Sequence, residues 1–156
     1  MAATLAMADA LPVAAQAPPP PTYGAPIGLE AAKKAMAASE AEAKKNNWPV
    51  AIAVLDTTGS LVLLTKLGNT QTGSVAIAEG KAKTALDFGR PSKAFQDMVA
   101  GGGVGIRIMS ANVMALESGV PIIVNGKVVG AVGVSGVTSE QDAQVAKAGA
   151  DAAAAK

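Results

Sequence analysis

Two β-rich apolar runs joined by Asn125-Gly126 constrain the fold of this chain more than any other feature. Val120–Val124 and Lys127–Val134 are the two runs, and Asn-Gly between them favours a type I′ turn, which needs positive φ at both central residues. The pattern predicts an antiparallel hairpin. Gly130 and Gly133 leave one face of the second run nearly bare, so either a packed helix or a ligand can lie against its backbone.

A second hairpin is predicted earlier in the chain, with strands over Val50–Leu55 and Leu61–Lys66. The residues between them, Asp56-Thr57-Thr58-Gly59, fit a tight turn with aspartate at its first position and glycine at its last. Asp56 is therefore either a turn cap or a catalytic carboxylate.

Helical patterns alternate with the two hairpins. They cover Leu29–Lys45, Val75–Phe88 behind a candidate N-cap at Ser74, a short helix capped by Ser92 and running through Val99, and Ser139–Ala154 behind a capping box at Thr138–Gln141. The stretch Ile106–Leu116 fits a strand or a helix equally well. Because tight turns join the strands of both hairpins, the sequence predicts an α+β fold, with a single antiparallel sheet flanked by helices.

The N-terminal region, residues 1–26, is predicted to be an extension, with the folded domain over residues 27–156. Residues 1–17 are alanine-rich and resemble the later part of an export signal, but they lack its basic region. If they are such a signal, the protein is periplasmic or secreted; otherwise it is cytoplasmic. Pro18–Pro21 favours an extended polyproline arm that projects from the domain or straps a neighbouring subunit.

The composition excludes several kinds of chemistry. The chain has 156 residues, which suits one domain, and it contains neither histidine nor cysteine. A Ser-His-Asp triad, histidine-ligated zinc, thiolate metal sites and cysteine nucleophiles are therefore excluded, and no metal site is predicted. A haem would need a less usual axial ligand. The net charge of +1 does not favour nucleic-acid binding, and no apolar run is long enough to span a membrane.

A resemblance to a known family rests on two separated motifs. Ala78-Glu-Gly-Lys-Ala-Lys-Thr-Ala85 with Phe88 resembles the A-x-x-K-A-x-T-A-x-x-F pattern of the GlcG/HbpS family, also called haem-degrading or DUF336 domains. Residues 117–136 resemble the second signature of that family. The resemblance implies a profilin-like fold with about five strands, assembly into homo-oligomers that are often octamers, and haem binding in some members.

The resemblance also suggests site residues. Ser74 falls where an exported haem-binding member uses a threonine hydroxyl to contact iron, although serine at this position also suits a helix N-cap. Lys81 and Arg90 could hold a carboxylate or a haem propionate. Thr84, in the same motif as Lys81, is grouped with them as a cofactor-binding candidate. Lys81 could instead serve a contact between subunits.

Three functions remain open from the sequence. The first is a haem- or tetrapyrrole-binding accessory or sensor-type protein that forms a homo-oligomer. The second is an enzyme for a small hydroxy- or oxo-acid, with Lys81 as base or anchor and Glu79 as proton carrier. The third is an oligomeric scaffold without a ligand. Assembly is predicted because a helix face of small residues, Val75-Ala78-Ala82-Ala85, needs a partner to bury it.

Overall fold

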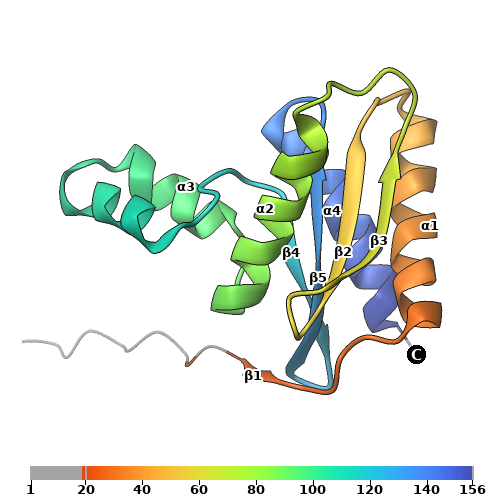
Figure 1. The fold of residues 1–156 in the computed structure, drawn as a ribbon, viewed down its shortest axis with the longest axis horizontal. Coiled ribbons are helices and arrows are strands. Elements are labelled where there is room, and N and C mark those ends of the chain that lie inside the picture. The colour runs from red at the N-terminus through yellow and green to blue at the C-terminus, as the bar shows by residue number, and fades with distance from the viewer. Residues whose placement is uncertain (1–18, 20, 156) are drawn as a thin grey trace, which may run out of the picture.

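The computed structural model describes residue 19 and residues 21–155. The expectations for residues 1–17, and those for Pro18 and Pro20 of the polyproline arm, lie outside these residues. The rest of the chain forms one five-stranded sheet with helices on both of its faces (Figure 1). The predicted α+β class is confirmed. Within the described residues, no helix combines the length and apolar character that a membrane span requires.

The elements follow one another in an order close to the predicted one. They are β1 (Thr22–Tyr23), α1 (Leu29–Lys45), β2 (Ala51–Asp56), β3 (Leu61–Lys66), α2 (Ser74–Phe88), α3 (Lys93–Ala100), the 3₁₀ helix η1 (Gly103–Ala111), β4 (Gly119–Val124), β5 (Lys127–Ser135) and α4 (Ser139–Ala154). The bounds of α1, β3 and α4 are those predicted, and the other predicted elements differ by one or two residues at their ends. The stretch Ile106–Leu116, which fits a strand or a helix by sequence, begins within η1 and continues beyond its end.

Strand β5 is the centre of the sheet. It pairs antiparallel with β2 along one edge and with β4 along the other, and β3 pairs with the outer edge of β2. β1 was not predicted and differs from the other strands, because it pairs parallel with the start of β5, Thr22 opposite Lys127. β2 pairs with β5 only from Gly130 onward. The part of β5 before Gly130 is therefore free on that edge to pair with β1. The sheet is thus not purely antiparallel, and ordered structure begins before residue 27.

Both predicted turns form. Asn125 and Gly126 have φ of 51° and 74°, the positive values that a type I′ turn requires. At the other hairpin, the carboxylate of Asp56 accepts hydrogen bonds from the Thr58 amide at 2.8 Å and from the Thr58 hydroxyl at 2.6 Å. These bonds support the turn-cap interpretation of Asp56. The Thr58 hydroxyl also holds the pKa of this carboxyl below its ordinary value.

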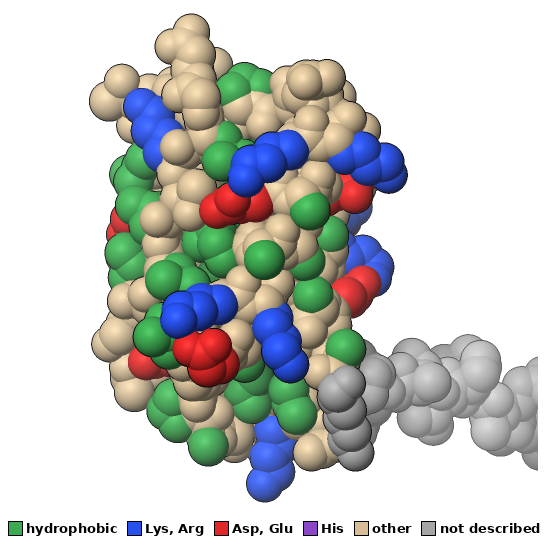
Figure 2. Space-filling view, turned by 90° about the vertical axis from the view of Figure 1, so that its right-hand side faces the viewer, with side chains coloured by type: hydrophobic (Ala, Val, Ile, Leu, Met, Phe, Trp, Pro, Cys, Tyr) green, Lys and Arg blue, Asp and Glu red, His purple; other side chains and the backbone are tan. Residues whose placement is uncertain are grey.

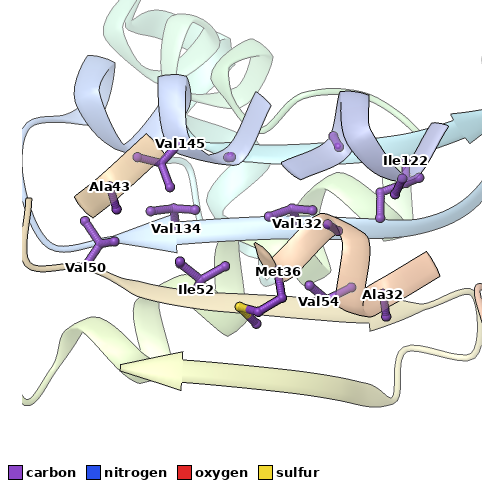
Figure 3. Close-up of a cluster of buried hydrophobic side chains, with 14 of the residues drawn as sticks. Ala32, Met36, Ala43, Val50, Ile52, Val54, Ile122, Val132, Val134 and Val145 are labelled. Carbon is purple, nitrogen blue, oxygen red and sulfur yellow. The ribbon is translucent and has the colours of Figure 1, made fainter. Parts of the chain in front are cut away.

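A valine-rich core lies between the sheet and the pair formed by α1 and α4 (Figure 3). The side chains of strands β2, β4 and β5 that point toward these two helices are mostly β-branched. The helices contribute alanine, methionine and valine side chains to the same core. Small residues here let the helices approach closely: a Cβ at Gly149 of α4 would lie 2.8 Å from the carbonyl of Ala35 in α1. The outer surface of α1 carries ion pairs such as Lys44 with Glu40, and basic and acidic side chains lie next to one another on this side (Figure 2).

A second core, built largely from alanine, lies between the other face of the sheet and α2. Ala78, Ala82 and Ala85 are fully buried there by the chain itself. The prediction that this face needs a second subunit is therefore wrong. A Cβ at Gly133 would lie 2.1 Å from the carbonyl oxygen of Ala78 and 2.5 Å from the Ala82 nitrogen. At Gly133 the strand thus accommodates a closely packed helix rather than a ligand. Gly130 lies on the opposite face, where a Cβ would meet Ile27, so the prediction that the two glycines share one bare face is wrong.

Between α2 and β4 the chain leaves the sheet. Residues 93–111, called the arm below, contain α3 and η1 and project from the body of the molecule (Figure 1). The predicted cap at Ser92 does not form. Its hydroxyl instead donates to the Leu116 carbonyl at 2.6 Å and accepts from the Gly119 amide at 2.8 Å. Ser92 therefore links the start of the arm to the chain that returns from it to β4.

Candidate functional site

Helix α2 carries four of the residues that the sequence suggested, and its first residue is Ser74. The N-cap position belongs to Gly73, and no side-chain capping bond forms, so the capping interpretation of Ser74 is wrong. Ser74 is instead 2% exposed, because the first turn of α2 already lies against the sheet. This burial leaves its hydroxyl little surface with which to contact a ligand.

Lys81 lies inside the protein, with 3% of its side chain exposed. Its Nζ donates to the Asp142 carboxylate at 3.2 Å, to the Val134 carbonyl at 2.9 Å and to the Ser118 hydroxyl at 2.8 Å. Burial lowers the pKa of Lys81, and the negative charge of Asp142 opposes that shift. An ammonium group has three donors, and here all three are used within the chain.

The role of Lys81 is therefore to connect elements that are distant in sequence. Its partners lie on β5, on α4 and just before β4, and Asp142 also accepts from the Val137 amide at 3.1 Å. The Lys81 side chain is therefore not accessible to a ligand or to another subunit in this structure. Glu79 projects from the other side of α2, so the acid–base pair considered from the sequence does not share a site.

Thr84 and Arg90 also have partners inside the chain. The hydroxyl of Thr84 accepts a hydrogen bond from the Met114 amide at 2.8 Å. The guanidinium of Arg90 stacks on the ring of Phe95, 4.5 Å from its centroid, at the base of the arm. Of the cofactor-binding candidates, Ser74, Lys81 and Thr84 thus lie on α2, and Arg90 follows its end. Most of them contact other parts of the same chain.

The outer face of α2 forms one side of a groove. A cavity of about 310 Å³ lies between α2 and the β2–β3 hairpin, and a neighbouring cavity of about 160 Å³ lies between α2 and the chain that returns from the arm. The two share Gly80 and Lys83 as lining residues, and together they are called the α2 groove below. Its lining residues are Leu55, Gly59, Leu61, Ala76, Glu79, Gly80, Lys83, Asn112, Val113 and Met114.

Local sequence explains the shape of the α2 groove. Gly80 has no side chain, and the methyl group of Met114 would lie 3.0 Å from a Cβ placed there. Thr84 holds the backbone of Met114 beside the helix. Met114 thereby lines the same cavity as Lys83, whose ammonium pairs with Asp87 at 2.8 Å. Sequence reasoning missed Met114, and the only signal for it was the glycine within the helical motif.

These residues fit a tetrapyrrole better than the residues first suggested. Leu61 supplies exposed apolar surface, the Met114 thioether is a known type of haem ligand, and Lys83 supplies a cation for an acidic substituent. A larger hollow of about 430 Å³ beside Trp48 and Leu67 contains no thioether. Across the described residues, acidic side chains form no cluster of three or more that could hold a metal ion.

Comparison with known proteins agrees with the motif. Residues 27–151 match the family model described as "Haem degrading protein HbpS-like". The chain belongs to the HbpS-like family. The predicted family is confirmed. Protein GlcG of Escherichia coli K12 is 42% identical over 109 residues, which cover 70% of this chain and 81% of GlcG.

Solved structures of the HbpS-like fold are similar to this chain. The crystal structure of Klebsiella pneumoniae protein ORFY has a TM-score of 0.78 and 29% identity, covering 94% of this chain and 99% of ORFY. The structure of the PduOC:haem complex has a TM-score of 0.73, covering 81% of this chain and 94% of PduOC. Its identity is 22%, so this likeness concerns the fold alone.

Proposed function

We propose that this HbpS-like protein is a haem- or tetrapyrrole-binding accessory protein that works as a homo-oligomer. The α2 groove is its binding site. The observation that carries the proposal is that Met114 and Lys83 line one cavity against the helix that bears the family motif. The family description and the haem complex of a structurally similar protein support the choice of ligand.

Each residue of the groove has a defined part in this proposal. Leu61 would contact the apolar macrocycle, the Met114 thioether would hold the iron, and Lys83 would exchange Asp87 for an acidic substituent. When bound, haem supplies redox-active iron. Thr84 is a positioning residue, because its hydroxyl fixes the backbone of Met114 without facing the groove.

Haemin titration tests the binding proposal. The protein should produce a Soret band that saturates at one haemin per chain, with the visible spectrum of an iron–thioether complex. Met114→Ala should alter that spectrum and weaken binding by about tenfold or more, since Met114 is the residue proposed to hold the iron. Leu29→Ala is the control, because Leu29 lies on α1 outside the α2 groove and is 50% exposed. No saturable Soret band, or equal effects of both variants, would reject the α2 groove as a haem site.

A further inference from the structure

Glu79 is the acidic residue of the α2 groove. It lines the cavity of about 310 Å³ between α2 and the β2–β3 hairpin, together with Lys83. The two residues are four apart on one helix, so their side chains lie on the same face, one turn from each other. The other residues that line this cavity are uncharged: Leu55, Gly59, Leu61, Ala76 and Gly80. A ligand in this cavity therefore meets one positive and one negative group.

The negative charge of Glu79 is not neutralised by Lys83. The two residues have the spacing and order that favour an ion pair on a helix. The Lys83 ammonium instead lies 2.8 Å from one carboxylate oxygen of Asp87 and 3.0 Å from the other. Across the described part of the chain, no basic group lies within ion-pair distance of Glu79, which is half-buried. Its carboxylate is therefore available to repel an acidic group of a ligand.

The charges alternate along this face of α2. Glu79, Lys83 and Asp87 follow one another at successive turns, so Lys83 has a carboxylate on each side. An acidic substituent that displaces Asp87 from Lys83 gains a counter-charge at that one place. A second acidic substituent, one helical turn further toward the start of α2, meets the like charge of Glu79. The α2 groove thus accepts acidic groups at Lys83 and disfavours them beside it.

We propose that Glu79 makes the α2 groove selective for tetrapyrroles whose acidic substituents lie together on one edge of the ring. The inference rests on the proposed function and names the class of ligand within it. The acidic edge lies at Lys83, and the uncharged remainder of the ring lies along Glu79 and Leu61, which is 46% exposed. A tetrapyrrole with carboxylates on every side brings one of them toward Glu79, so it binds more weakly. Glu79 is a specificity-determining residue in this arrangement.

Titration with metal-free porphyrins, followed by their fluorescence, tests the inference without iron and so without the proposed part of Met114. Protoporphyrin IX carries its carboxylates on one edge, and uroporphyrin carries them all round the ring. The unmodified protein should bind protoporphyrin IX more tightly. Glu79→Gln, which removes the charge and keeps the shape, should raise the affinity for uroporphyrin by about threefold or more and that for protoporphyrin IX by less than about twofold.

Glu30→Gln is the matched control. It makes the same change in net charge on α1, where the Glu30 side chain is 83% exposed, and it should leave both affinities unchanged. Added salt should reduce the effect of Glu79→Gln, because ions screen exposed charges. An effect that persists in high salt would trace the selectivity to the shape of the side chain and overturn the inference.

The remaining outcomes separate this inference from the proposed function. If protoporphyrin IX binds and Glu79→Gln leaves the affinity for uroporphyrin unchanged, or raises both affinities equally, the selectivity is overturned and the tetrapyrrole site stands. Equal affinities of the unmodified protein for the two porphyrins overturn the selectivity in the same way. Saturable binding of neither porphyrin, together with no Soret band in the haemin titration, overturns the proposed function and this inference with it.

Discussion

At the scale of single residues, Lys81 is a charge held inside the protein by one carboxylate, one carbonyl and one hydroxyl. Removing it leaves Asp142 buried without its counter-charge. We expect Lys81→Met to lower the free energy of unfolding by about 3–5 kcal/mol, the usual cost of breaking a buried pair. Urea denaturation measures this loss.

Lys83 provides the matched control for Lys81. It lies two residues away on the same helix and pairs with Asp87, but its side chain is 55% exposed. Lys83→Met should change the free energy of unfolding by about 0–1 kcal/mol, because water screens an exposed ion pair. Equal losses in the two variants would contradict the assignment of Lys81 to the structural interior.

The carboxyl of Asp56 makes stability depend on pH in acid. The hydroxyl of Thr58 donates to it and lowers its pKa below the ordinary value of 3.8. A carboxyl with a lowered folded-state pKa stabilises the protein above that ordinary value, and the contribution is lost as the pH falls through the folded-state pKa. The stability difference between the unmodified protein and Asp56→Asn should therefore be constant near neutrality and shrink below pH 3.8.

Urea denaturation at a series of pH values measures the Asp56 effect. Thr58→Val removes the hydroxyl donor while keeping the shape of the side chain, so it should weaken the same acid dependence. A difference between the unmodified protein and Asp56→Asn that stays the same at every pH would show that the turn does not depend on the charge of Asp56.

At the scale of elements, the contact between β5 and α2 depends on a glycine. A Cβ at Gly133 would overlap the backbone of Ala78 and Ala82, so α2 must move to admit it. Gly133→Ala should cost about 1–3 kcal/mol of unfolding free energy, which is typical of overpacking. Gly73→Ala is the control, because a Cβ there meets nothing within 4 Å and the backbone is helical. Thermal or urea unfolding of both variants decides the point, and equal stability would contradict the close contact.

Elements with strong local signals were predictable. Alanine, glutamate and lysine specify α1, Asn125-Gly126 specifies its hairpin, and the capping box at Thr138 and Gln141 is present at the start of α4. β1 was missed because two residues carry too little periodicity to indicate a strand. The stretch Ile106–Leu116 was ambiguous because its apolar residues fit helical and strand spacing equally well, and its first part belongs to η1, a 3₁₀ helix.

At the scale of the whole molecule, the proposed homo-oligomer would make stability depend on protein concentration. Association stabilises the folded state by mass action, so the melting temperature of the unmodified protein should rise on concentration. Calorimetry over a hundredfold concentration range measures this rise, and a concentration-independent melting temperature in the unmodified protein would contradict the homo-oligomer.

The sequence by itself determined the α+β class, both hairpins, the main helices and the family, because turns, capping residues and motifs are local properties of the chain. Only the tertiary structure decided the site. Whether Lys81 faces a ligand or the interior depends on Asp142 and Val134, which lie more than fifty residues away and meet it only when the sheet forms. Met114 became a candidate for the same reason, because long-range packing brings it against Gly80.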